Sequence, residues 1–256
     1  MLAAIGGIAA FGGFLSGLLG IGGAVIMIPL LFYVPELLGV GSLGMKEVTG
    51  LSIVHVLAAS ISATIVHSRQ RNVSRDLVVL AGSSMLAGSF LGGILSGYVP
   101  DRILLGVYAI LATLAFGMLL SRPRREVAPQ SGEALSFSRL LATVPLLALG
   151  LLMGLIGAGG GFMLMPYMVY VLGTPTRLAI GSALGVSLLS SLGGFAGKVA
   201  ASQISLPPAI ALVSGAVPGA YLGGLVSRRC APRTLRAILA FVVLTVAVRV
   251  WYDLLG

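Results

Sequence analysis

Long stretches without a charged residue constrain this chain more than any other feature. Only 9% of its 256 residues are charged and 57% are hydrophobic, whereas soluble domains carry about 25% charged and about 45–50% apolar residues. An uncharged run of roughly 18 residues or more is typical of a membrane span. The runs of that length are 1–35, 48–68, 77–100, 103–121, 140–176, 178–197 and 199–227. They lack the alternation of a membrane β-barrel, so the sequence predicts an all-α polytopic membrane protein.

The remaining composition excludes several other classes. The net charge of +9 sits in short connections between apolar runs, where membrane topology explains it, so we expect a lipid bilayer and no nucleic acid as partner. The single Cys230 cannot form an intramolecular disulfide. No Cys/His cluster has metal-ligand spacing, so we expect no metal and no cofactor. The N-terminal run is too long for a cleaved signal peptide and is expected in the mature fold.

A glycine-rich motif occurs twice. Residues 17–24 (GLLGIGGA) return in the second half of the chain as 154–161 (GLIGAGGG), and Pro29 falls on Pro166 at the same shift. Glycine is frequent in membrane helices, so one such match is also explained by chance.

A second matched motif makes duplication the better interpretation. Residues 88–93 (GSFLGG) return as 219–224 (GAYLGG), at a slightly shorter shift than the first motif. Two motifs in the same order indicate an internal repeat. A long polar segment, residues 122–138, lies between the two copies. The sequence therefore predicts a first repeat over 1–121, a polar linker over 122–138 and a second repeat over 139–256.

Each half begins with an apolar stretch that glycines interrupt. Residues 1–35 as one helix would reach ~50 Å, whereas the hydrocarbon core measures roughly 30 Å. Three helices follow each broken stretch, and we place them at 48–67, 77–98 and 102–121, then at 177–199, 207–227 and 233–254.

The breaks are the candidate binding sites. Unwound backbone inside a membrane is tolerated only where it is buried in protein or lines a wet cavity. Helix N-termini at such a break expose N–H groups with partial positive charge, which favour anions. Interrupted helices at matching positions of two halves indicate the binding site of a transporter. The alternative is that the glycines only permit close helix packing.

The basic residues favour one topology. If each broken stretch crosses the membrane once, the 16 Lys and Arg residues divide nine to seven. If each stretch is a hairpin that returns to its own side, they divide twelve to four, which agrees far better with the positive-inside rule. The hairpin arrangement inverts the two halves relative to each other. It also places both termini outside and the 122–138 linker in the cytoplasm.

These motifs resemble a known family. The broken first helix, its copy, the central loop and residues 218–224 (PGAYLGG) are similar to the sulfite exporter TauE/SafE family over essentially the whole chain. The resemblance implies a bacterial or archaeal plasma-membrane exporter of sulfite, sulfoacetate or a related small anion. It assigns binding to the glycines of the breaks, which are Gly20, Gly22, Gly23, Gly157, Gly159, Gly160 and Gly161.

Polar side chains after each break complete the predicted site. Hydroxyls donate to an oxyanion without adding a charge, and an ionisable group at membrane depth is a functional candidate. The candidates are Thr49, Ser52, His55 and Ser60 in the first half and Ser182, Ser187, Ser190 and Ser191 in the second. The alternative for the hydroxyls is back-bonding within their own helix, and for His55 a bond to a neighbouring carbonyl. Lys198 has two interpretations, a cation that draws anions toward the pore mouth and snorkelling to the membrane interface, and we expect the second.

An enzyme is one rival interpretation, and two further questions stay open at this stage. A hydrolase would need a nucleophile with a matched base, which the spans lack, so we expect no enzyme. An anion channel, or a permease for a carboxylate or another small organic anion, would share the same dipoles. Small-residue faces such as Gly88 and Gly92 pack either within one protomer or between two, which leaves a homodimer open.

Overall fold

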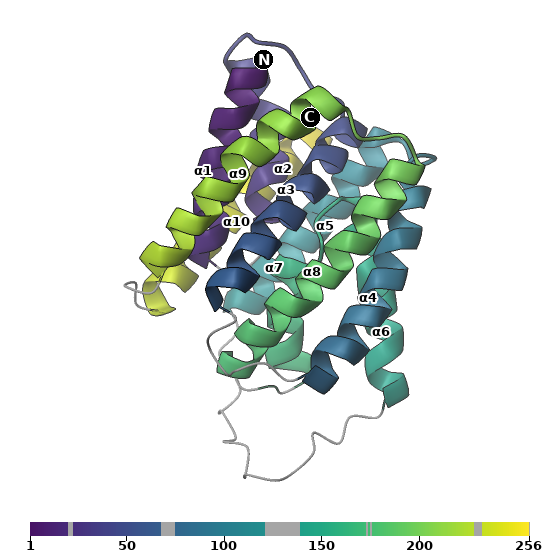
Figure 1. The fold of residues 1–256 in the computed structure, drawn as a ribbon. Helices are drawn as coiled ribbons and strands as arrows, with labels where there is room; N and C mark the ends of the chain where they lie inside the picture. The colour runs from purple at the N-terminus through teal and green to yellow at the C-terminus, as the bar shows by residue number, and fades with distance from the viewer. Residues whose placement is uncertain are drawn as a thin grey trace.

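The chain folds as a bundle of helices (Figure 1). The computed structural model describes residues 1–19, 23–67, 75–120, 139–172, 174, 176–227 and 232–255. The helices are α1 (Leu2–Leu19), α2 (Ala24–Leu37), α3 (Met45–His67), α4 (Arg75–Leu95), α5 (Asp101–Leu120), α6 (Arg139–Leu155), α7 (Gly161–Pro166), the π-helix η1 (Tyr167–Val171), α8 (Thr176–Ala200), α9 (Leu206–Ser227) and α10 (Pro232–Leu255). Four of these, α4, α5, α8 and α9, contain segments long and apolar enough to cross a membrane. The prediction of a helical membrane protein is confirmed.

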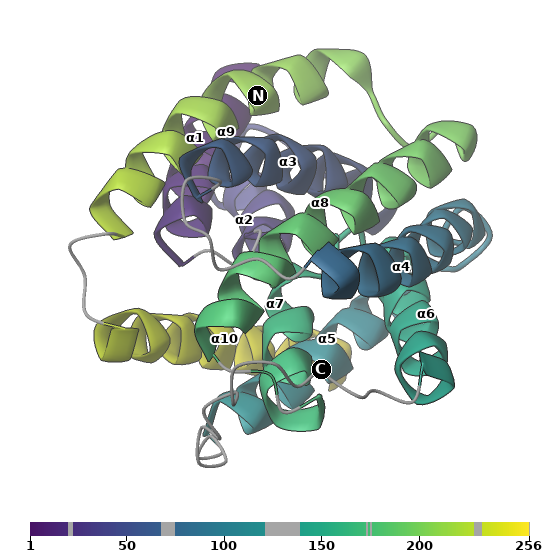
Figure 2. The same cartoon turned by 60° about the horizontal axis from the view of Figure 1, so that its bottom comes forward.

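The helices form two outer groups with short helices between them. One row runs in the order α1, α9, α3, α8, α4, α6, and α5 pairs with α10 on the opposite side (Figure 2). The short helices α2 and α7 lie between the row and the pair, and they contact each other. The segments that follow the two glycine breaks are therefore enclosed by protein.

Helix positions follow the uncharged runs closely, with one informative difference. The sequence predicts a helix from residue 48, whereas α3 begins at Met45. The Met45 N–H donates to Asp101 Oδ2 over 2.9 Å, so a carboxylate from α5 caps α3 from a distance. This tertiary cap explains the earlier start.

The first broken stretch turns back on itself. A Cβ built on Gly12 of α1 would lie 2.7 Å from Met27 Sδ of α2, and one on Gly41 would lie 3.6 Å from Met1 Sδ. The helix α2 therefore returns along α1 to the end from which α1 started. Both chain termini lie at this end (Figure 1), where Arg102 Nη2 donates to Leu254 O over 3.3 Å. We call it the terminal face.

Glycines place the first helix of each broken stretch against a helix of the other half. A Cβ built on Gly13 of α1 would lie 2.6 Å from Ala216 O of α9, and one on Gly150 of α6 would lie 2.7 Å from Met85 O of α4. Four further contacts join glycines to carbonyl oxygens: Gly219 to Ala10, Gly223 to Phe14, Gly88 to Leu147 and Gly92 to Leu151. The small-residue face around Gly88 and Gly92 thus packs within one protomer.

These contacts recur at the spacings of the sequence motifs. Gly13 and Gly150 are related by the shift that relates 17–24 to 154–161. Their partners Met85 and Ala216 are related by the shift of the second motif. The α1–α9 and α4–α6 interfaces therefore use corresponding positions of the two halves. In both, residue numbers increase together, so the paired helices run parallel.

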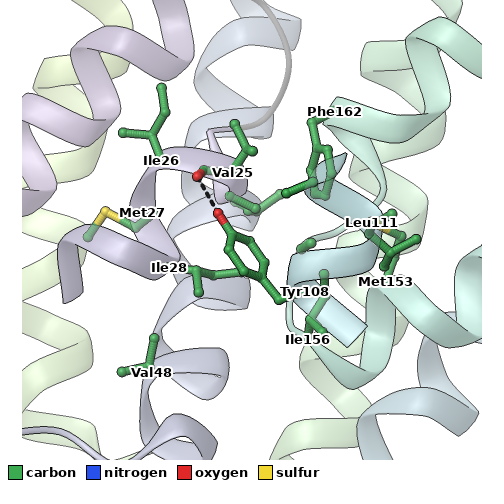
Figure 3. Packing of buried hydrophobic residues seen from close by; sticks show 14 of the residues in the cluster. Val25, Ile26, Met27, Ile28, Val48, Tyr108, Leu111, Met153, Ile156 and Phe162 are labelled. Atoms are coloured by element: carbon green, nitrogen blue, oxygen red, sulfur yellow. Dashed lines mark hydrogen bonds between the residues drawn. The ribbon is translucent and has the colours of Figure 1, made fainter. Parts of the chain in front are cut away.

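The core closes around Tyr108 of α5. Its ring points toward Val25 of α2, with Ile28 beside it, and Met153 of α6 and Phe162 of α7 belong to the same cluster (Figure 3). Residues of both halves thus share one hydrophobic core.

Candidate functional site

The first break ends at Gly23, the N-cap of α2. Gly23 has φ +69°, a left-handed conformation that suits glycine. Its carbonyl accepts from Ile26 and Met27 N–H over 3.1 and 2.9 Å, so the N–H groups of Ala24 and Val25 precede the first intrahelical bonds. The predicted residues Gly20 and Gly22 lie outside the described part of the chain.

Two polar side chains border this break. A Cβ built on Gly23 would lie 2.7 Å from Ser16 Oγ and 3.2 Å from His55 Nε2. Ser16 and His55 are both buried. The N-terminus of α2 therefore faces an imidazole from α3 and a hydroxyl from α1.

The second break begins where α6 ends in a Schellman motif. The Ala158 N–H donates to Met153 O over 2.8 Å and the Gly157 N–H to Gly154 O over 3.2 Å, with Gly157 at φ +67°. Gly159 and Gly160 also have positive φ, at +57° and +81°. Gly161 is the first residue of α7. Three left-handed positions within four residues explain why the sequence places glycines here.

This second break lies against the central helices α3 and α8. The built Cβ of Gly157 would contact Thr49 O, that of Gly159 would lie 3.2 Å from Ser191 Cβ, and that of Gly160 would lie 3.6 Å from Ser190 Oγ. No side chain larger than hydrogen fits at Gly157. The backbone of the break therefore touches the polar faces of two helices directly.

The paired helices α3 and α8 both carry buried polar side chains. Lys198 Nζ donates to Thr49 Oγ1 over 2.7 Å, and Ile53 lies beside Gly194, so the two helices pair antiparallel. We call the polar side chains of these two helices the polar seam, and it consists of Thr49, Ser52, His55, Ser60, Ser187, Ser190, Ser191 and Lys198, all buried.

Some seam hydroxyls already have protein partners. Thr49 Oγ1 donates to Lys46 O over 2.9 Å and Ser191 Oγ to Leu188 O over 2.9 Å, which is the back-bonding alternative. Ser187 Oγ donates to Gly159 O over 3.1 Å, from α8 to the second break. Ser182, buried five residues before Ser187, also has an interaction partner. Of these bonds, that of Ser187 joins α8 to the second break.

Four other seam residues have polar atoms without a hydrogen-bond partner among the described residues. Ser52 Oγ, both ring nitrogens of His55, Ser60 Oγ and Ser190 Oγ are buried without a hydrogen bond to any described residue. Each buried unsatisfied group costs about 1–3 kcal/mol, so native structures rarely keep several together without a reason. In the described part of the structure His55 makes no hydrogen bond to a neighbouring carbonyl, so the alternative proposed for it is not observed. These four side chains carry the unpartnered polar atoms of the seam.

Sequence reasoning missed three polar residues of this region. Ser16 borders the first break, and Ser89 of α4 is a buried unpartnered hydroxyl with Oγ 2.7 Å from a Cβ built on Gly194. The expectation that Lys198 snorkels is wrong, because its side chain is 0% exposed. A signal existed for Lys198, since it is the only charged residue between Arg177 and Arg228.

Two broken helices beside a buried polar seam, enclosed in an apolar bundle, define a class: polytopic membrane transporters built on interrupted helices. The model of the family described as "Sulfite exporter TauE/SafE" matches residues 5–250, so the chain belongs to this family.

Similar proteins agree with the class but are named only in general terms. The "Probable membrane transporter protein YunE" of Bacillus subtilis is 24% identical over 94% of both chains. A "Probable membrane transporter protein" of Xylella fastidiosa is 29% identical over 93% of this chain and 90% of the relative. The "Probable membrane transporter protein MJ0441" of Methanocaldococcus jannaschii is 26% identical over 89% and 87%. No solved structure matches the chain.

Proposed function

We propose that this protein is a secondary transporter that exports a small anion. The expected substrate is sulfite or a related sulfur-containing or organosulfonate anion, bound at mid-membrane between the two breaks. The observation that carries the proposal is the set of buried, unpartnered groups on Ser52, His55, Ser60 and Ser190 beside the left-handed glycines. The family description adds the sulfur chemistry.

The groups suit an oxyanion. A neutral imidazole donates from one nitrogen, and each serine hydroxyl donates once, so these groups stabilise negative charge without needing a counter-charge. The first-turn N–H groups of Ala24 and Val25 add the partial positive charge of a helix N-terminus. His55 and α2 thus form one side of the site, and Ser190 with Gly160 the other. An anion between them would satisfy donors that otherwise destabilise the fold.

The repeat organisation is part of the proposal. We assign a first repeat to 1–121, a linker to 122–138 and an inverted second repeat to 139–256. The matching contacts of Gly13 and Gly150 with the opposite half support this assignment. The distribution of basic residues supports a cytoplasmic linker and a plasma membrane location with the terminal face outside. Transport would then follow from exchange between two related arrangements of the halves.

The test is an uptake panel with purified protein in liposomes. Sulfite, thiosulfate, sulfate, sulfoacetate and acetate are compared with a rubidium control. We expect saturable uptake of a sulfur oxyanion. The His55→Leu variant should lower uptake at least about tenfold, which corresponds to about 1.4 kcal/mol. The matched control is Ser83→Ala, because Ser83 is exposed on α4 and bonds only its own helix.

Each other outcome rejects part of the proposal. Acetate flux without sulfur-anion flux would assign the site to carboxylates, and non-saturating flux would indicate a channel. Rubidium flux without anion flux would mean that the glycine breaks are not anion sites. The relatives' names are consistent with a protein that is not an enzyme. Recovery of chemically unchanged substrate on both sides of the membrane would support the same conclusion.

A further inference from the structure

Lys198 is a buried cation at the terminal-face end of the polar seam. Its side chain is 0% exposed. Its Nζ donates to Thr49 Oγ1 over 2.7 Å, to Gln203 Oε1 over 2.7 Å and to Leu155 O over 3.1 Å. All three N–H groups of the ammonium are therefore used, and all three acceptors are neutral.

The positive charge of Lys198 is not balanced by an ion pair. No carboxylate among the described side chains lies within ion-pair distance of Nζ, and the charged groups that act on it from farther away, Lys46 and Asp101, have opposite signs. Leu155 is the last residue of α6, and Lys198 itself lies in the last turn of α8, so the negative ends of two helices lie near the ammonium. Their partial charges stabilise the ammonium, but no described carboxylate pairs with it.

A turn and hydrogen bonds after α8 hold the acceptor of Lys198 in place. Ser202, which follows α8, has φ +53° and is the only non-glycine with positive φ in the described part of the chain. This left-handed turn lets Gln203 N–H donate to Lys198 O over 3.0 Å while its side chain accepts from Nζ. The hydroxyl of Ser96, just after α4, lies 3.1 Å from the same Gln203 Oε1 and also reaches Gly93 O, so its one proton is shared between these two acceptors. A strained turn and a second hydrogen bond thus fix the acceptor of one lysine.

The second glycine break, residues 157–161, lies next to the residues that bind Lys198. Leu155 precedes Gly157 by two residues, and Gly157 packs on the backbone oxygen of Thr49, whose hydroxyl binds Lys198. An anion at the break would lie within the reach of the lysine's field. At about 10 Å and an effective dielectric of about 20, one unit charge changes the affinity for a monovalent anion about tenfold.

We propose that Lys198 is a specificity-determining residue of the transporter, supplying a positive charge that favours anions and favours divalent over monovalent ones. This inference rests on the proposed function. Thr49, Gln203 and Ser202 are positioning residues for that charge. No described carboxylate pairs with the ammonium, so its charge acts on the substrate as well as on the helix ends.

The experiment compares sulfate with methanesulfonate, which carry two charges and one. Each competes for uptake of the transported anion in liposomes that contain wild-type protein, Lys198→Gln, Lys198→Met or Lys198→Arg. We expect Lys198→Gln and Lys198→Met to weaken methanesulfonate about tenfold and sulfate about a hundredfold, because the effect scales with charge. Lys198→Arg should keep most of the preference. Arg102→Gln is the matched control, since Arg102 is an exposed cation at the same face.

The outcomes separate this inference from the proposed function. No anion uptake by wild-type protein would reject the proposed function itself. Uptake by wild type, with equal weakening of both competitors in Lys198→Gln and Lys198→Met, would overturn the inference, because a purely structural role does not distinguish the two charges. Loss of folding in both neutral variants while Lys198→Arg folds would also overturn it and assign the charge a structural role.

Discussion

The hydroxyl of Tyr108 donates to the carbonyl oxygen of Val25 over 2.6 Å (Figure 3). In an unbroken helix Val25 O would accept from the N–H of residue 29, but Pro29 has none. Tyr108 therefore supplies, from α5, the donor that the proline removes from α2. The corresponding proline of the second half, Pro166, is followed directly by the π-helix η1 (Tyr167–Val171). At the shift of the second motif, the counterpart of Tyr108 is Leu239, which has no hydroxyl. The helices that follow the two breaks, α2 and α7, are thus supported in different ways.

Removing the Tyr108 hydroxyl should destabilise the fold. Tyr108→Phe leaves Val25 O buried without a donor, and we expect a loss of about 1–3 kcal/mol in the free energy of unfolding. Thermal unfolding in detergent, followed by the fluorescence of Trp251, measures the change. Tyr98→Phe is the control, because Tyr98 is 84% exposed. Equal unfolding temperatures for Tyr108→Phe and wild type would contradict the role given to this bond.

The left-handed turn at Gly157 should tolerate no side chain. An alanine there would be strained at φ +67° and its Cβ would meet Thr49 O. We expect Gly157→Ala to abolish transport and to lower the yield of folded protein. At Gly106 of α5 a Cβ meets nothing within 4 Å, so Gly106→Ala should be neutral or should stabilise by up to about 1 kcal/mol. Size-exclusion profiles and uptake report both effects, and a fully active Gly157→Ala would reject the tight contact.

Corresponding glycines should respond alike. A Cβ on Gly92 would meet Leu151 O of α6, and one on Gly223 would meet Phe14 O of α1. We expect Gly92→Ala and Gly223→Ala to destabilise by similar amounts, about 1–3 kcal/mol each. Gly7→Ala on the open side of α1 is the control, since nothing lies within 4 Å of its Cβ. A large effect in one variant and none in the other would argue against equivalent interfaces.

Cysteine labelling tests the orientation in the membrane. In a Cys230→Ser background, Tyr98→Cys and Leu206→Cys place thiols at exposed positions of the terminal face, where the native side chains are 84% and 72% exposed. Ser131→Cys places one in the linker. A membrane-impermeant maleimide added to intact cells should label residues 98 and 206 and spare residue 131. The reverse pattern would contradict the positive-inside assignment.

Local sequence patterns predicted the helices well because a helix that crosses a membrane excludes charged residues over most of its length. The predicted helix over 177–199 is α8 (Thr176–Ala200), and that over 207–227 is α9 (Leu206–Ser227). The break at residues 157–161 was visible because positive φ selects glycine. His55 was found because an ionisable group is rare at membrane depth.

Contacts between the halves could not be predicted in the same way. Lys198 and Thr49 are 149 residues apart, and nothing in either local sequence states that they meet. Without that contact, a lysine near a helix end is best interpreted as snorkelling. Asp101 likewise caps α3 across 56 residues, so the start of α3 was placed too late. Both misses concern partners that only the tertiary fold supplies.

The pairing of α1 with α9 has a consequence for biosynthesis. The glycines of α1 contact carbonyls of α9, and Gly6 packs on Ala211 O, so α1 leaves the ribosome long before the helix that it packs against. At about 5–20 residues per second, that delay is on the order of tens of seconds. During this time the glycine-lined side of α1 faces lipid or the insertion machinery. The α4–α6 pair closes much sooner after its parts are made. The α4–α6 interface can therefore form before the α1–α9 interface.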